Sequence, residues 1–181
     1  MKKGDIVGKK KKARRADPLE ALIERALELG ASRAKAIPAS SVVVGEWVRW
    51  KCQYGCGGYG RCLTCPPRSP APEETKRALA SYKRAILFQA GRGEVREIIA
   101  LLEREVFLAG YYKAFGMASG PCRLCGECNL SGACRHPDEA RPSMEACGVD
   151  VYATVRSAGW EIDVVRTEQD PARFFGLVLV D

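Results

Sequence analysis

Residues 83–110 read KRAILFQAGRGEVREIIALLEREVFLAG and carry the clearest structural pattern in this chain. The apolar run at 85–88 is followed by a glycine-rich turn and is typical of a buried strand. Over 94–109 an apolar residue recurs every three or four positions, which predicts an amphipathic helix that ends at Gly110. Because such a strand and such a helix each need a partner for their apolar faces, the stretch indicates helices packed on a sheet.

The segments on either side add further helices and strands. Helix-start signals and apolar periodicity predict three more helices, at 17–30, 70–79 and 143–158, the last with a break near Gly148. Apolar, β-branched and aromatic runs predict short strands within 33–50, an edge strand at 161–166 and a buried strand at 174–180, the last two as a hairpin. We therefore expect an α+β fold, with a small mixed sheet, packed helices and a cysteine-rich lobe at one end.

Length and charge indicate one globular domain with a basic extension. The chain has 181 residues, of which 46% are hydrophobic and 28% charged, which suits a single domain. Residues 1–17 contain eight lysines and arginines and two aspartates, so they carry +6 of the formal net charge of +7. We expect a disordered basic arm at 1–16 and a single domain at 17–181.

The partners and location expected from composition are limited. A nearly neutral body argues against nucleic acid as a partner, except for a weak contact through the basic arm. No run approaches the ~20 apolar residues that a membrane helix needs, and the basic start lacks the apolar stretch of a signal peptide. We therefore expect a cytoplasmic protein with no membrane partner.

The nine cysteines exceed what a chain of this size needs for stability. In a reducing compartment they indicate metal or redox chemistry rather than disulfides, and an odd number cannot pair completely within one chain. This makes 17–181 a predicted metal-binding domain. The cysteines fall into two groups and one isolated residue.

The later group has the sharper spacing, C-x2-C-x2-C-x5-C. Its members are Cys122, Cys125, Cys128 and Cys134. Three thiolates at three-residue steps wrap a loop around a compact body, and a fourth ligand follows from farther along, which is how a [4Fe-4S] cluster is held. Zinc sites more often use two well-separated C-x2-C pairs. We expect a [4Fe-4S] cluster on these four cysteines, with buried or free thiols as the alternative.

The earlier group has the spacing C-x3-C-x5-C-x2-C and comprises Cys52, Cys56, Cys62 and Cys65. Four glycines lie among them, which allows tight turns and brings backbone N–H groups close to sulphur. We expect a second metal centre here, with a flexible loop and reduced thiols as the alternative. The Cys65-Pro66 pair is similar to the end of ferredoxin motifs, whose last cysteine binds the other cluster, so the groups could exchange ligands.

Two further residues are weaker candidates. Cys147 lies within a predicted helix, and we expect it to be a small buried apolar residue rather than a ligand. The single histidine, His136, follows Cys134 closely, and we expect it to support the centre from outside or to be exposed rather than to bind metal.

Seven short motifs follow one another along the chain: WKCQYGC (50–56), CPP (65–67), YYKAF (111–115), GPCRLC (120–125), RHP (135–137), ARPSME (140–145) and GVDV (148–151). Through them the sequence, from about residue 34 onward, resembles an uncharacterised prokaryotic family described as predicted metal-binding proteins. The resemblance implies metal binding and no particular substrate. It matches every cysteine except Cys62 and Cys147, and so implies a first site with three firm thiolates. It also singles out Arg141, Ser143, Glu145 and Asp150, which alternatively start a helix and satisfy nearby backbone groups.

We therefore expect an iron–sulphur protein with at least one [4Fe-4S] cluster, which passes single electrons to a redox partner protein. If the first centre has only three thiolates, its open position could take a substrate, and the protein would be a small reductase. The alternative is an adaptor for protein or nucleic acid in which zinc is a structural metal.

Overall fold

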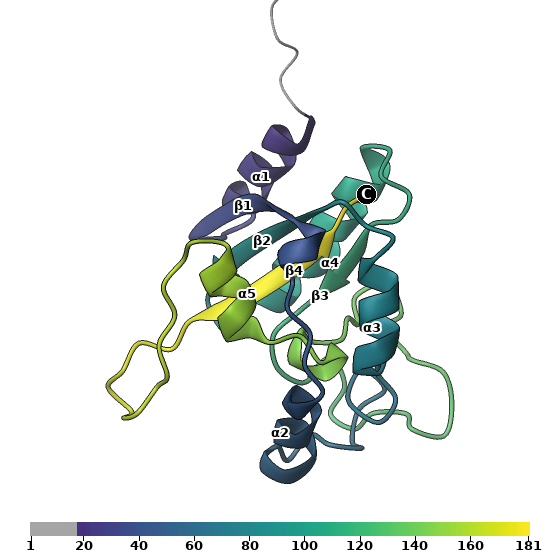
Figure 1. Ribbon diagram of the computed structural model, residues 1–181. Coiled ribbons are helices and arrows are strands. Elements are labelled where there is room, and N and C mark those ends of the chain that lie inside the picture. The colour runs from purple at the N-terminus through teal and green to yellow at the C-terminus, as the bar shows by residue number, and fades with distance from the viewer. Residues whose placement is uncertain (1–17) are drawn as a thin grey trace, which may run out of the picture.

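A four-stranded antiparallel sheet forms the centre of the structure (Figure 1). The computed structural model describes residues 18–181, and the expected basic arm lies outside them. In spatial order the strands are β1 (Arg33–Pro38), β2 (Arg84–Ala90), β4 (Phe174–Leu179) and β3 (Phe115–Met117). The α+β class is confirmed, and the sheet is antiparallel throughout where a mixed sheet was expected.

The two central strands, β2 and β4, are almost wholly apolar because both of their faces are covered. Ile86 and Phe88 belong to the core on one side of the sheet, and Leu87 to the core on the other. Phe88 lies opposite Gly176 in the β2–β4 register, and a side chain at Gly176 would collide with the Phe88 ring. Burial on both faces explains why these strands lack a polar alternation in the sequence.

Two amphipathic helices, α1 (Pro18–Glu28) and α4 (Glu94–Leu108), cover one face of the sheet. The buried residues of α4 are those with helical spacing, namely Val95, Ile98, Ile99, Leu102 and Val106. Each such side chain contributes about 1.5–3 kcal/mol when removed from water. Both helices were predicted from the sequence, and both predictions are confirmed.

The other face is covered by shorter pieces: α3 (Pro72–Leu79), the 3-10 helix η2 (Glu145–Cys147) and α5 (Val151–Ser157). The predicted helix at 143–158 is present as η2 and α5, with the expected break at Gly148. The predicted helix at 70–79 corresponds to α3, where the Glu74 carboxylate accepts a hydrogen bond from the Ala71 N–H at 2.7 Å.

Three expectations about strands are corrected. Within 33–50 only β1 is a strand; it is followed by the 3-10 helix η1 (Ala39–Ser41), and the aromatic run belongs to the helix α2 (Trp47–Gly55). The segment 161–166 forms no strand and so no hairpin with β4, whereas β3, which pairs with β4, was not predicted. Within residues 18–181 no helix combines the length and the apolar character needed to cross a membrane.

Gly148 is expected to tolerate no side chain. Its φ is +79°, and an added Cβ would lie 2.7 Å from Pro72 Cγ and 3.2 Å from Pro72 Cα. Gly159 has a similar φ of +76°, but nothing lies within 4 Å of its Cβ position. Gly159→Ala should therefore lower the free energy of unfolding by about 1 kcal/mol through backbone strain alone, and Gly148→Ala by about 3 kcal/mol. Urea denaturation measures both, and equal losses would show that contact with Pro72 has no effect.

Candidate metal centre

The two cysteine-bearing segments lie side by side at one end of the fold (Figure 1). The first segment connects α2 to α3, and the second connects β3 to η2. The Cys62 thiol donates to the Cys122 carbonyl oxygen, with 3.6 Å between sulphur and oxygen. The Leu63 N–H donates to Cys128 Sγ at 3.4 Å. The expected cysteine-rich lobe therefore contains both groups in contact with each other.

A cavity of about 530 Å³ lies between these segments and is lined by five cysteines. They are Cys62, Cys122, Cys125, Cys128 and Cys134. The structure thus brings all four members of the later group around one space, as their spacing suggested. It also places there one member of the earlier group, Cys62, in keeping with the idea that the groups could exchange ligands.

The surroundings of this cavity suit a negatively charged group. Three arginines line it, namely Arg61, Arg123 and Arg135, against the single carboxylate Glu127. Backbone N–H groups point at the sulphurs, because Leu63 donates to Cys128 and the His136 N–H donates to Cys134 Sγ at 3.4 Å. A [4Fe-4S] core with four thiolates is an anion, so nearby cations and N–H donors stabilise it.

A single ion and a cluster place different demands on the spacing of the sulphurs. Among residues 18–181, no three His, Cys, Asp or Glu side chains lie close enough together to share one ion. Zinc, with Zn–S bonds of about 2.3 Å, requires its sulphurs within about 4 Å of one another. A cubane holds its thiolates at separate corners and therefore farther apart.

The earlier group converges on Cys65, which is only 7% exposed. Burial raises the pKa of this thiol to about 12, and the thiols of Cys62, Cys56 and Cys52 add to the shift. Gly58 lies against the group: its N–H donates to Cys56 Sγ at 3.4 Å, and an added Cβ would be 3.9 Å from Cys65 Sγ. The other three predicted members of the first centre thus all lie near enough to Cys65 to affect its pKa.

Cys62 stands between the two groups. Burial raises the pKa of its thiol, and among the neighbours Cys128 has the largest effect, while a hydrogen bond with Cys65 opposes the shift. Because Cys62 also lines the cysteine cavity, assigning it to the later group leaves Cys52, Cys56 and Cys65 as a three-thiol first group. The sequence resemblance likewise left Cys62 out of the firmly matched positions.

Metal uptake is expected to release protons. The pKa values of Cys52 and Cys62 are raised, mainly by burial, and that of Cys65 is about 12, so these thiols keep their protons at neutral pH without metal. A thiol binds metal only after losing its proton, so affinity should rise as the pH increases from about 6 to about 8. Titrating Cd²⁺ into metal-free protein with a pH indicator should detect about one proton per bound thiol. Binding without proton release would show that the thiolates exist beforehand.

The two weaker candidates take different places. Cys147 is fully buried in the apolar core beneath the sheet, where burial raises its pKa to about 12. His136 is half-buried at the cysteine cavity, with Nδ1 4.0 Å from Glu139 Oε1. These positions accord with the expected structural role of Cys147 and with a supporting place for His136.

Of the four residues that the resemblance singled out, three have structural partners. The Ser143 hydroxyl accepts from the Ala146 N–H at 3.1 Å, and the Asp150 carboxylate accepts from the Ala153 N–H at 2.9 Å as the cap of α5. Arg141 forms a two-pronged ion pair with Glu103, at 2.5 and 2.8 Å. These contacts agree with the alternative interpretation, in which these residues start a helix and satisfy nearby backbone groups and charges.

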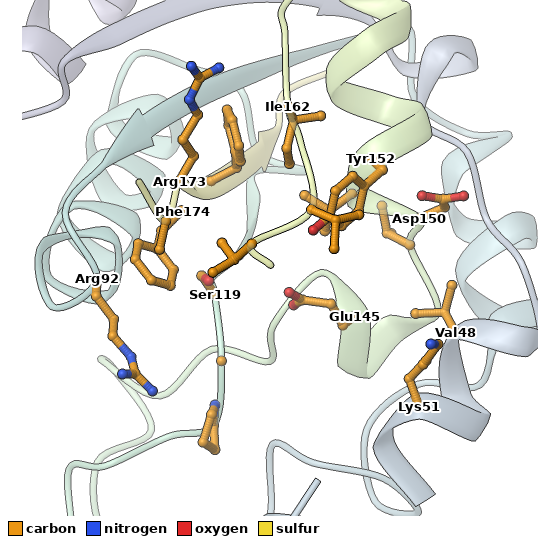
Figure 2. A pocket seen from close by; sticks show the side chains of 18 of the residues that line it. Val48, Lys51, Arg92, Ser119, Glu145, Asp150, Tyr152, Ile162, Arg173 and Phe174 are labelled. Atoms are coloured by element: carbon orange, nitrogen blue, oxygen red, sulfur yellow. The ribbon is translucent and has the colours of Figure 1, made fainter. Parts of the chain in front are cut away.

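Glu145, the fourth, is only partly engaged, because the Ser143 side chain and its own backbone N–H form hydrogen bonds with one part of its carboxyl group. Its Oε2 atom is shielded from water and has no hydrogen-bond partner within the described part of the chain. Burial raises the pKa of this carboxyl group, and its two hydrogen bonds oppose the rise. The side chain borders a second cavity of about 910 Å³, shown in Figure 2, whose lining comes from segments far apart in the sequence. Several of the motifs contribute to its lining, among them Glu145 of 140–145 and Asp150 of 148–151, but no sequence pattern indicated that they border one cavity.

The paired thiol groups on an α+β scaffold are the features of a metal-binding protein. Residues 35–180 match the family model DUF2284, described as a predicted metal-binding protein, and the chain belongs to that family. This confirms the resemblance drawn from the motifs. No curated protein and no solved structure matches the chain.

Proposed function

We propose that this protein is an iron–sulphur protein that holds a [4Fe-4S] cluster in the cysteine cavity and passes single electrons to a redox partner protein. The observation that carries the proposal is the presence of five cysteines around one cavity of about 530 Å³. Cys122, Cys125 and Cys128 supply three ligands from one loop. Cys134 is the expected fourth ligand, and Cys62 lines the same space from the other segment.

The bound cluster would supply one-electron redox chemistry, which proteins tune through charge and hydrogen bonds at the sulphurs. The chain's contribution is to hold the thiolates, to offset their charge through Arg61, Arg123 and Arg135, and to donate backbone N–H groups. Hydrogen bonds to the sulphurs and positive charge nearby both stabilise the reduced cluster, which carries one more negative charge than the oxidised cluster. These residues would therefore set the reduction potential.

A partner could approach at the rim of the cavity. Leu124 and Leu130 border the cavity and are 38% and 39% exposed, among the arginines described above. Redox partners typically meet through small interfaces that separate easily, and a modest apolar contact ringed by charge suits such an encounter. This surface supports delivery of an electron to another protein.

The proposal is tested by spectroscopy on anaerobically purified protein. A [4Fe-4S] cluster gives a broad charge-transfer band in the visible region that dithionite bleaches, together with an EPR signal of the reduced state. The same sample should transfer its electron to an artificial acceptor such as ferricyanide. A protein that contains iron but neither bleaches nor gives an EPR signal after reduction would contradict the electron-transfer role.

Structural zinc is the second candidate, and one observation favours it. The thiols of Cys52, Cys56 and Cys62 all raise the pKa of Cys65, and together with Cys65 they make four, the number of ligands that structural zinc takes. Zinc there would fasten the segment between α2 and α3 without redox chemistry. It would give a colourless protein with about one zinc per chain and no acid-labile sulphide.

A further inference from the structure

The larger cavity, of about 910 Å³, has the size of a small-molecule site. Figure 2 shows side chains from several elements directed into it, among them Val48 and Lys51 of α2, Tyr152 of α5, and Phe174 at the start of β4. It does not coincide with the cysteine cavity, although Arg123 borders both.

One part of the wall is apolar. Val48, Val149, Ile162 and Phe175 are all buried residues whose surfaces line the cavity. Phe174 is half-buried beside them and presents its ring to the cavity (Figure 2). A wall of this kind accepts the flat or branched apolar body of an organic molecule.

Another part of the wall is cationic. Six basic side chains line the cavity: Lys51, Arg92, Arg96, Arg123, Arg156 and Arg173. Three carboxylates accompany them, of which Asp150 is engaged as the cap of α5. Within residues 18–181 none of the six cations forms a salt bridge; Arg96, Arg156 and Arg173 donate only to backbone carbonyls. The cavity therefore carries uncompensated positive charge, which attracts an anion.

The carboxyl group of Glu145 adds a hydrogen-bonding group to the cavity wall. Its Oε2 atom is shielded from water and unpartnered among the described residues, and Figure 2 shows the carboxyl group directed into the cavity. Buried polar atoms in native proteins nearly always have a partner, so an unpartnered one that faces a cavity indicates a group that a ligand supplies. The matching group on the ligand is a hydrogen-bond donor such as a hydroxyl.

We propose that this cavity is a binding site for a small organic anion with an apolar body and a hydroxyl or amine donor. The anionic group would meet Arg92, whose guanidinium carbon lies 5.9 Å from the centre of the Phe174 ring at the cavity wall. The apolar body would pack on Phe174 and Ile162, and the donor would pair with Glu145 Oε2. Cys52 Sγ is 3.9 Å from the Glu145 carbonyl oxygen, so the ligand would lie beside the first cysteine group.

The test uses three probes that differ in one group each, measured by anaerobic titration calorimetry on the full-length protein as purified. The probe para-hydroxycinnamate has the ring, the carboxylate and the hydroxyl. Cinnamate lacks the hydroxyl, and para-hydroxycinnamamide lacks the charge. We expect para-hydroxycinnamate to bind with a Kd below about 1 mM, and each of the other two to bind about tenfold more weakly. Absence of heat at about 1 mM, or equal binding of acid and amide, would overturn the proposal.

Variants locate the binding. Arg92→Gln removes an exposed cation at the cavity and should weaken para-hydroxycinnamate about tenfold, whereas Arg104→Gln, the same change at an exposed position of α4 away from the cavity, should not. Glu145→Ala should abolish the advantage of para-hydroxycinnamate over cinnamate. Equal effects of the two arginine changes, or an unchanged preference for the hydroxyl, would overturn the assignment. Because only binding is measured, the outcome is separate from whether the cysteines hold iron or zinc.

Discussion

Cys128→Ser is expected to remove the cluster from the cysteine cavity, with a loss of about four iron atoms per chain. Cys128 borders that cavity, and its sulphur accepts the hydrogen bond from Leu63 that joins the two segments. A serine oxygen is a poor ligand for iron, and the remaining thiolates would be left without their shared partner. Iron and sulphide analysis of anaerobically purified protein measures the loss.

The matched control is Cys147→Ala. Cys147 is also a cysteine of the second half of the chain, but it is fully buried in the core and lines neither cavity. Its truncation should cost about 1 kcal/mol of stability and leave the iron content unchanged. If Cys147→Ala lost iron while Cys128→Ser kept it, the assignment of ligands would be wrong.

Arg141→Ala is expected to lower the free energy of unfolding by about 3–5 kcal/mol. The Arg141 and Glu103 side chains are only 16% and 14% exposed, so truncation leaves a buried carboxylate without its cation. The same arginine donates to the carbonyl oxygens of Pro137 and Ala140, each at 3.0 Å, and so fastens the end of the cysteine segment to α4. Urea denaturation followed by circular dichroism gives the change.

Arg25→Ala provides the comparison, because Arg25 also pairs with a glutamate of α4, although only its Nε atom donates to both carboxylate oxygens. That pair, with Glu105, has contacts of 2.9 and 3.0 Å, but its side chains are 41% and 34% exposed. Water screens such a pair, so the change should lower the free energy of unfolding much less than Arg141→Ala does. Equal losses for Arg141→Ala and Arg25→Ala would show that burial of the Arg141 pair has no energetic consequence.

The sequence predicted those elements whose apolar pattern is long and local. The α4 helix shows five buried residues at helical spacing, and β2 and β4 are continuous apolar runs. The run at 47–50 suggested a strand because tryptophan and valine favour strands, but it forms α2, which buries only Val48 and packs against η2. There the tertiary contact outweighs the local preference.

Two other errors have the same origin in contacts between distant residues. The three-residue strand β3 contains Gly116 and exists only because it pairs with β4, more than fifty positions later. In 161–166 only Ile162 is buried, while Val164 and Val165 border the larger cavity, so an alternating pattern there reflects a cavity wall rather than a paired strand. Pairing partners of this kind leave no local signature.

The sequence predicted which cysteines belong to the candidate site, but not how they are arranged in space. Cysteine spacing identified both groups, since ligands within one loop are close in sequence as well as in space. The position of Cys62 beside Cys122 and Cys128 depends on how two segments sixty residues apart pack together. The larger cavity depends on still more segments, and of its residues the family resemblance had singled out only Glu145 and Asp150 beforehand.

The most direct test of a cluster in the cysteine cavity is the ratio of iron, zinc and acid-labile sulphide in anaerobically purified protein. A [4Fe-4S] cluster predicts brown protein with about four iron atoms and four sulphides per chain, or about twice that if both cysteine groups hold clusters. Colourless protein with stoichiometric zinc and no sulphide would contradict the iron–sulphur assignment.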